Sequence, residues 1–309
     1  MSTIKRKLYT FFHTPRIVMK KFASSPIFRL LPDKLSLKIQ YKNIFLKPLN
    51  LKNPQTFNEK LQWLKLYDRK PEYSTMVDKY EAKKYVASII GEEYIIPTYG
   101  VYNSFDEIDF DALPEQFVLK CTHGSGDIII CKDKSSFDIN QARSKLTKSL
   151  NTNYYKISRE WPYKNVKPRI IAEKYMIDDS TDCKSLSDYK FFCFNGKYEL
   201  LVYIKDRDYE QKTALFAYFD KNLSPCNVLQ EGEIYAGPID LPNSVNTMIE
   251  LAQKIASNLI QARIDFYYIN SQIYFGEITF FNAGGFSPFY PEEWDDMLGA
   301  KIHLPQKSR

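Results

Sequence analysis

The chain has 309 residues, of which 44% are hydrophobic and 26% charged, a composition typical of a globular protein with one large or two moderate cores. Its net charge of +6 arises in residues 1–50, which contain eleven Lys or Arg and one acid, while the rest of the chain carries −4; this argues against a uniformly basic nucleic-acid binder. Five scattered cysteines without a CxxC pair and only three histidines argue against a disulfide framework, a zinc site or a His-based catalytic triad.

Residues 1–50 are interpreted as a basic N-terminal arm. Within residues 1–22, apolar side chains at helical spacing lie beside Lys5, Arg6 and Lys7, a pattern typical of a basic amphipathic segment on an anionic membrane. The alternative is a helical arm packed on the body with a solvated basic face, and both interpretations stay open. No apolar run approaches the roughly 20 residues of a membrane span. We therefore expect a cytoplasmic protein that could contact the inner face of the cell membrane through residues 1–22.

Residues 51–95 are predicted to form a helical region. Thr56 with Glu59 three residues later fits a capping box, and the apolar side chains that follow recur at helical spacing to Tyr67. A second helix is predicted from Ser74 to Ile90, ended by a glycine.

From residue 96 the pattern changes to short apolar runs separated by polar turns, which predicts an α+β body whose strands pair in local meanders. We divide this body into 96–170, which contains a glycine loop, and 171–309, which contains a pair of acids. The predicted strands are 117–121, 128–131, 169–176, 189–195, 198–204, 214–219 and the hairpin 262–279; the predicted helices are 139–151 and 244–260.

The glycine loop lies between the strands 117–121 and 128–131. Its glycines, Gly124 and Gly126, allow the backbone to approach an anion closely, and His123 and Ser125 stand beside them. Lys120, at the end of the first strand, could reach phosphates as a point charge. The alternative is an ordinary turn.

Two further segments carry candidate binding groups. Where the strand 169–176 passes into a loop, exposed backbone at Glu173–Met176 could bind the edge of an adenine, and Asp178 could reach a ribose hydroxyl. At the start of the next strand, alternation places Asp188 and Lys190 on the same face. The alternative for that pair is a surface ion pair of little value.

The last predicted hairpin contains Asp265 in its first strand and Glu277 in its second. Two facing carboxylates repel unless a cation lies between them, and oxygen-only ligands indicate Mg²⁺ bound together with nucleotide phosphates. Arg263 shares the face of Asp265. The alternative is a solvated hairpin with two unrelated acids.

Taken in order, the lysine, the glycine loop, the strand-loop glutamate, Asp-Tyr-Lys, Arg-Ile-Asp and Glu-Ile-Thr resemble the ATP-grasp superfamily. More specifically, the chain resembles the TupA-like ATP-grasp family, named for teichuronopeptide biosynthesis, from about Leu35 to Leu304. The most specific stretches are 53–63, 117–120, 188–196 and 274–280. The resemblance implies an ATP-grasp fold, two α+β subdomains gripping ATP, preceded by a helical region.

The resemblance also implies roles for individual residues. Arg263 would stabilise negative charge on the reacting acyl group, and Lys190 would lie near the transferred phosphate. Mg²⁺ would be ligated by Asp265, Glu277 and Thr279, although many family ligases have Asn at the position of Thr279. The implied ATP-binding residues are Lys79, Lys120, His123, Gly124, Ser125, Gly126, Glu173, Lys174, Tyr175, Met176, Asp178 and Asp188, with Lys83 as the second choice for the phosphate-contacting role of Lys79.

The implied activity is ATP-dependent carboxylate–amine ligation through an acylphosphate. By family analogy, an amino acid would be joined to a uronic acid of a capsular or other cell-surface polysaccharide or its precursor, with Arg159 and Tyr163 lining the sugar pocket. The alternatives are an ATP-dependent kinase of the same fold, a polysaccharide-pathway glycosyltransferase using the acids of Asp206-Arg207-Asp208, and a non-enzymatic basic module.

Overall fold

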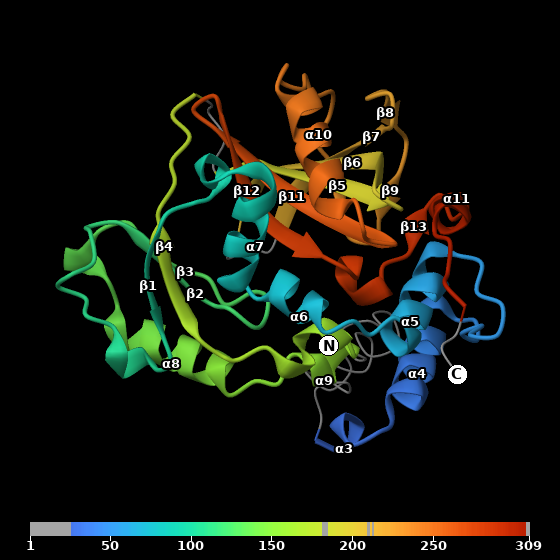
Figure 1. Ribbon diagram of the computed structural model, residues 1–309, viewed down its shortest axis with the longest axis horizontal. Helices are drawn as coiled ribbons and strands as arrows, with labels where there is room; N and C mark the ends of the chain where they lie inside the picture. The colour runs from blue at the N-terminus through green and yellow to red at the C-terminus, as the bar shows by residue number, and fades with distance from the viewer. Residues whose placement is uncertain (1–25, 181–184, 209–210, 212, 307–309) are drawn as a thin grey trace, which may run out of the picture. The chain divides into compact units, whose positions relative to one another are not determined.

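The computed structural model describes residues 26–180, 185–208, 211 and 213–306 (Figure 1). The predicted amphipathic segment 1–22 therefore lies outside the described residues. Contacts within the chain define two compact units. Of the described residues, unit 1 takes 26–69, 153–164 and 281–306, and unit 2 takes those within 70–152 and 165–280. The chain thus passes between the units several times, whereas the sequence division was into four consecutive segments.

The described residues begin with five helices, and groups of strands separated by one or two helices follow. The helices are α3 (Pro26–Arg29), α4 (Asp33–Phe45), α5 (Phe57–Tyr67), α6 (Glu72–Val77), α7 (Glu81–Ile90), α8 (Ile139–Leu150), α9 (Tyr155–Ser158), α10 (Val245–Ala256) and α11 (Glu293–Lys301). The strands are β1 (Thr98–Tyr102), β2 (Phe117–Cys121), β3 (Ile129–Cys131), β4 (Ile170–Lys174), β5 (Asp188–Phe194), β6 (Lys197–Asp208), β7 (Thr213–Asp220), β8 (Pro225–Cys226), β9 (Leu229–Gln230), β10 (Ile234–Tyr235), β11 (Gln261–Ile269), β12 (Gln272–Thr279) and β13 (Phe289–Tyr290). None of the described helices has both the length and the apolar character needed to cross a bilayer.

Unit 1 is helical, and α5 lies at its centre. The predicted capping box is confirmed: the Thr56 hydroxyl accepts from the N–H of Glu59 at 3.2 Å, and the Glu59 carboxylate accepts from the N–H of Thr56 at 3.4 Å. Phe57 and Leu61 are fully buried, and α5 packs against α4 and α11. The box therefore fixes where the helix begins, and apolar burial holds its inner face.

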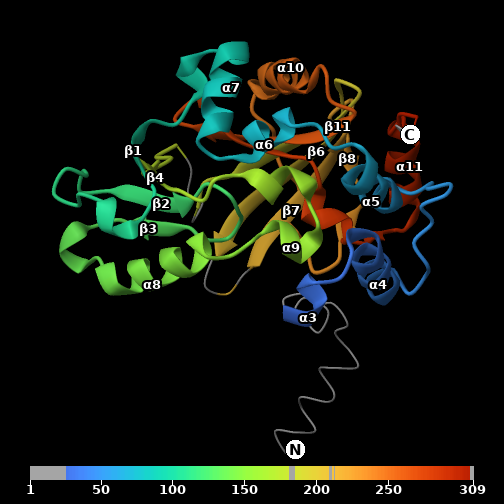
Figure 2. The same ribbon diagram turned by 60° about the horizontal axis from the view of Figure 1, so that its bottom comes forward.

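Unit 2 contains two antiparallel sheets. The smaller sheet has the strand order β1-β4-β2-β3, and the larger one runs β10-β7-β6-β5-β11-β12, with β8 added at β7 and β10 parallel to it. Helix α8 covers the smaller sheet at β2, as Figure 2 shows, and α10 packs on β5, β6 and β11. The predicted α+β class is confirmed.

The predicted helix from Ser74 to Ile90 is wrong: it is broken into α6 and α7. The carboxylate of Asp78 accepts hydrogen bonds from the N–H groups of Tyr80 at 2.9 Å and Glu81 at 3.3 Å, which caps the start of α7. An aspartate side chain that binds the next N–H groups competes with a continuous helix. Lys79 consequently lies in non-helical backbone.

A one-residue bulge sets the face of the last hairpin. From the turn, pairing proceeds as Ile269 with Gln272 down to Phe266 with Phe275, after which Asp265 pairs with Glu277. Gly276 is therefore the extra residue of the bulge. In a hairpin without the bulge, Asp265 would pair with Gly276, and Glu277 would point to the opposite face. A Cβ on Gly276 would lie 3.1 Å from the carbonyl oxygen of Asp265, closer than the bulge allows without a shift.

Candidate active site

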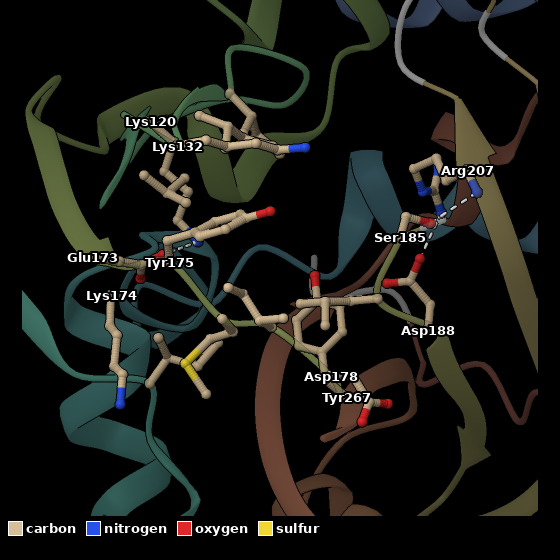
Figure 3. Close-up of a pocket in the computed structure, with 17 residues that line it drawn as sticks. Lys120, Lys132, Glu173, Lys174, Tyr175, Asp178, Ser185, Asp188, Arg207 and Tyr267 are labelled. Atoms are coloured by element: carbon tan, nitrogen blue, oxygen red, sulfur yellow. Dashed lines mark hydrogen bonds and ion pairs between the residues drawn. The ribbon is translucent and has the colours of Figure 1, made fainter. Parts of the chain in front are cut away.

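A pocket with a volume of about 270 Å³ is formed by residues of unit 2 (Figure 3). One wall is aliphatic, with Val118 of β2 and Ile128 and Ile130 at β3. The segment 174–178 after β4 and side chains of β5, β6 and β11 complete the lining. A concave site with an apolar wall and a few charged groups is the usual form of a small-molecule site.

Glu173 is buried at the end of β4 and joins two lysines. Lys120 Nζ lies 2.5 Å from Glu173 Oε2, and Lys83 forms an ion pair with Oε1. Lys83 also donates to the carbonyl of Ile96 at 2.7 Å and the hydroxyl of Thr98 at 2.9 Å. Burial raises the pKa of Glu173, but the charges of Lys120 and Lys83 outweigh it and leave the pKa below its ordinary value. Glu173 is therefore ionised and holds Lys120 at the pocket.

Lys79 contacts the glycine loop twice from the break between α6 and α7. Its backbone N–H donates to the carbonyl of Thr122 at 3.1 Å, and its Nζ donates to the carbonyl of Gly124. Burial lowers the pKa of Lys79, and the nearby charge of Glu277 is the largest effect opposing that shift. The broken helix thus brings a lysine to the loop and within electrostatic reach of the hairpin.

The glycine loop is anchored to the end of α8 by His123 and Asp127. The Nε2 of His123 lies 3.1 Å from the carbonyl of Ser149 and 3.2 Å from that of Thr152, and the Ser149 hydroxyl donates to Asp127. Burial lowers the pKa of His123, which favours the neutral ring with Nε2–H donating to these carbonyls. His123 therefore holds the loop from beneath.

The other predicted ATP-site residues surround this arrangement. Gly124 is buried in the loop, whereas Ser125 and Gly126 are exposed at its tip, where Gly126 has a φ of +90°. The residues that line the pocket besides Lys120 and Glu173 include Lys174, Tyr175, Met176, Asp178 and Asp188. In Figure 3, Glu173 and Tyr175 lie on the same side as Lys120, and Asp188 lies across the pocket with Ser185 and Arg207.

Beside the pocket, six charged side chains form a row in which the sign of the charge alternates. The row crosses four adjacent strands, β6, β5, β11 and β12, and we call it the ionic row. In order, its members are Arg207, Asp188, Lys190, Asp265, Arg263 and Glu277. Because each charge neighbours its opposite, the row can remain ionised although Asp188 and Asp265 are buried and the other four members are half-buried.

The pocket end of the ionic row is held by Asp188. Arg207 Nη2 lies 2.6 Å from Asp188 Oδ2, and Lys190 Nζ lies 3.5 Å from Asp188 Oδ1. The backbone N–H of Arg207 donates to the hydroxyl of Ser185 at 2.9 Å. Lys190 also forms an ion pair with Asp265, its cross-strand neighbour. The Asp188–Lys190 pair is thus buried in a network and is not a surface ion pair.

The far end of the row joins both hairpin acids through Arg263. Its Nε lies 2.7 Å from Asp265 Oδ1, and its Nη2 lies 2.7 Å from Asp265 Oδ2 and 2.8 Å from Glu277 Oε1. Thr279 donates to the same Oε1 at 2.9 Å. Burial raises the pKa of Glu277, but Arg263 and Lys190 outweigh it and lower the pKa to about 2. The cation between the acids in this structure is a guanidinium.

A comparison with known families gives a match over most of the chain. The model described as TupA-like ATP-grasp matches residues 59–303. The chain belongs to the TupA-like ATP-grasp family. The predicted family and the ATP-grasp fold are thereby confirmed. A comparison with curated proteins found no match.

Solved structures of ATP-grasp enzymes resemble the chain at low identity. The D-alanine–D-alanine ligase of Bacillus anthracis complexed with ATP has 16% identity and a TM-score of 0.38, over 66% of this chain and 53% of that one. The corresponding ligase of Helicobacter pylori has 17% identity and a TM-score of 0.40, over 81% and 69%. The ATP-grasp ligase PsnB with minimal precursor, Mg and ADP has 11% identity and a TM-score of 0.37, over 72% and 57%. This chain therefore spans about half the length of the first of these enzymes.

The carboxylates of this ATP-grasp protein differ in what they could offer Mg²⁺. Both oxygens of Asp265 already accept from Arg263 or Lys190. The side chain of Glu277 is 40% exposed, and the described residues donate no hydrogen bond to its Oε2. Within the described ranges, no group of three or more His, Cys, Asp or Glu is arranged to hold a metal. Glu277 with the Thr279 hydroxyl would fit a Mg²⁺ ion that also binds nucleotide phosphates, and Asp265 would be available to it only if Arg263 or Lys190 turned away.

The predicted sugar-contacting residues belong to unit 1. Arg159 is buried and donates to the carbonyls of Phe28 at 3.0 Å and Leu31 at 3.1 Å. The ring of Tyr163 lies 4.8 Å from that of Tyr154 in an edge-on arrangement. The pocket and the ionic row are built from unit 2, so the sugar-binding role of Arg159 and Tyr163 stays a prediction.

Three charged groups at the site, Arg207, Lys132 and Lys83, have no primary nucleotide-binding role among the residues predicted from the sequence. Lys83 was the second choice for the phosphate-contacting lysine and instead binds Glu173. Arg207 stood between two acids considered as a metal pair, yet it is Arg207 that lines the pocket. A register shift in β6 between Lys205 and Asp208, with a φ of +51° at Asp206, breaks the alternation from which its direction could have been predicted.

Proposed function

We propose that this protein is an ATP-dependent carboxylate–amine ligase. ATP would transfer its γ-phosphoryl group to a substrate carboxylate, giving an acylphosphate and ADP, and an amine would then displace phosphate to form an amide. Such transfer requires positioning and charge neutralisation more than a protein nucleophile. The pocket-lining residues include no cysteine or histidine but several lysines and an arginine, which supports this chemistry.

The ionic row is the observation that carries the proposal. It runs from the pocket to Glu277 and contains Lys190 and Arg263, which would lie beside the substrate carboxylate, where negative charge would be transferred between phosphate and acyl oxygens. Preorganised cations at such a position stabilise the developing charge without reorganising during the reaction. When bound, Mg²⁺ would neutralise phosphate charge, and Glu277 with Thr279 would hold it.

Each region of the pocket would bind one part of the nucleotide. The aliphatic wall of Val118 and Ile130 would pack on the adenine faces, and the backbone after Glu173 would bind its edge. Lys120 and Lys79 would bind the phosphates beneath the glycine loop. Asp178 and Asp188 would lie toward the ribose.

For the second half-reaction, we propose that an amino acid supplies the amine and a uronic acid of a surface glycan or its precursor supplies the carboxylate. This choice rests on the family to which the chain belongs. Site occupancy by nucleic acid is not expected, because the body of the chain carries net negative charge.

The decisive experiment is product analysis by mass spectrometry. The full-length protein is incubated with Mg-ATP and a panel of amino acids and uronic acids, and an amide product with stoichiometric ADP is expected only when both co-substrates are present. ADP release with the sugar alone, together with a stable phosphosugar, would instead identify a kinase. Transfer from a nucleotide sugar that is abolished by Asp206→Asn would identify a glycosyltransferase.

A further inference from the structure

We propose that the outer side of α4, with the pocket beside it, is a docking surface for an anionic lipid bilayer. The surface lies within unit 1 and consists of Lys34, Lys38, Lys42, Leu35 and Leu46, which we call the α4 surface; helix α4 itself is labelled in Figure 2. It is independent of the ligase proposal, because it contains no residue of the unit 2 pocket or of the ionic row.

The lysines of the α4 surface lie on one side of the helix. They recur every four residues, so that successive lysines are turned by only about 40° around the axis. All three are exposed, whereas the neighbouring side of the helix buries Leu37 and Tyr41 completely. The helix therefore satisfies its core contacts with one side and presents positive charge on the other.

Near α4, the solvent-exposed surface carries an excess of positive charge. Between residues 26 and 52 there are six Lys or Arg and a single acid, Asp33. Asp33 is bound to Arg69 at 2.8 Å and also accepts from Tyr155, so its charge is neutralised internally. The exposed lysines consequently attract anions without an acid of their own segment to oppose them.

Two leucines next to the lysines are exposed, and contact with water is unfavourable for their apolar side chains. Leu35 is 46% exposed and Leu46 is 83% exposed. Leu46 also ends α4 in left-handed backbone, with a φ of 56°, where glycine or asparagine is the usual residue. Exposed leucines beside lysines can enter the membrane interface while the lysines meet anionic headgroups.

A pocket of about 320 Å³ adjoins these lysines. Lys34 and Lys38 line it together with Lys52 and Tyr67, over a floor that includes Leu49. Three ammonium groups and a phenol around a concave surface fit the phosphate of an anionic headgroup. The pocket and the helix side together favour a lipid surface over a flat protein partner.

The test uses vesicle flotation with the full-length protein. Vesicles of phosphatidylcholine alone are compared with vesicles containing about 30% phosphatidylglycerol, at about 0.1 M and about 0.5 M salt. We expect binding to the anionic vesicles at low salt and its loss at high salt. In Lys34→Glu/Lys38→Glu/Lys42→Glu we expect the partition coefficient to fall by at least about tenfold. The matched control, Lys148→Glu/Lys221→Glu/Lys254→Glu, makes the same change in net charge with exposed lysines of unit 2 and should stay within about twofold of the wild type.

Leu46→Asn separates docking from folding. Asparagine is better suited than leucine to left-handed backbone, so the melting temperature should be maintained or raised while binding to anionic vesicles weakens. The proposal is overturned if the wild type fails to float with anionic vesicles, if the α4 triple variant binds as well as the wild type, or if the control triple variant loses as much. Retention on polyglutamate without flotation would likewise overturn it and assign the surface to an acidic polymer.

Discussion

Arg207 and Asp188 connect the pocket to the rest of the ionic row. Asp188 is shared between Arg207 and Lys190, so the position of Lys190 depends on a residue two strands away from the hairpin. Removing one partner from a buried charged network leaves the other uncompensated. The residues of the row should therefore act as a unit, and their substitutions should not be additive.

Arg207→Gln should lower kcat/KM for ATP by about tenfold, because Asp188 would then draw Lys190 away from Asp265. The measurement is steady-state kinetics of ADP release. Arg207→Lys should recover part of the loss, since it keeps the charge but not the planar guanidinium. Equal rates for Arg207→Gln and the wild type would contradict a positioning role.

Lys120→Ala should weaken ATP binding by about tenfold or more, because it removes a charge-assisted contact to phosphate and leaves Glu173 with Lys83 alone. Isothermal titration of the nucleotide measures the effect. Lys148→Ala, an exposed lysine on α8, is the control and should bind as the wild type does. Unchanged affinity in Lys120→Ala would remove this lysine from the phosphate site.

Glu277→Gln should reduce turnover by at least about a hundredfold while the protein stays folded. Its pH dependence is also defined. The pKa of Glu277 in the folded protein, about 2, is below the ordinary value, so its ionised form stabilises the fold at neutral pH, and this contribution is lost as the pH falls toward 2. The wild type should therefore melt above Glu277→Gln at pH 7, and the difference should shrink between about pH 4.5 and pH 2. A constant difference would show that the charge is not responsible.

At the scale of single elements, two local irregularities build the site. The bulge at Gly276 turns Glu277 and Thr279 to the face of Asp265, and the Asp78 cap breaks a helix so that Lys79 reaches the glycine loop. The hairpin and its turn could be predicted from apolar runs and turn residues, and so could the presence of one acid in each strand. The bulge that makes the pairing of Asp265 with Glu277 possible could not, because alternation in the sequence assumes an unbroken register.

Gly276→Ala should lower kcat by about tenfold, since the new Cβ would press on the carbonyl of Asp265 and displace the carboxylate pair. The melting temperature should fall by only a few degrees. Ser271→Gly, at the turn of the same hairpin where φ is 65°, should leave kcat unchanged. A loss of kcat as large in Ser271→Gly would mean that the effect comes from general loosening of the hairpin.

At the scale of the whole molecule, the chain builds its two units from non-consecutive segments. Residues 153–164 belong to unit 1, although the segments before and after them belong to unit 2. The described residues after Phe280 also belong to unit 1. Periodicity along the sequence locates α5, α8 and α10, since it reports which face of each helix is buried. It does not report which distant segment supplies the partner. Four consecutive segments were therefore the natural division from the sequence, and the capping box and apolar strands were the parts it could predict best.

This organisation predicts where nucleotide binding should protect the backbone. Hydrogen exchange followed by mass spectrometry should show slower exchange with Mg-ATP at 118–131, 173–180 and 261–279, all in unit 2. Helix α5 of unit 1 serves as the internal reference and should change least. Protection confined to unit 1 would place the nucleotide elsewhere.

The guanidinium of Arg263 also stabilises the hairpin without a metal ion. Because Arg263 is a counter-ion for both Asp265 and Glu277, the fold of the nucleotide-free protein does not need a divalent ion to offset repulsion between the two carboxylates. A chelator should accordingly leave the melting temperature of the nucleotide-free protein unchanged, and added magnesium should raise it only when ATP is present. The protein would then take up its metal as part of the nucleotide complex, so that low free magnesium in a cell limits catalysis without endangering the fold.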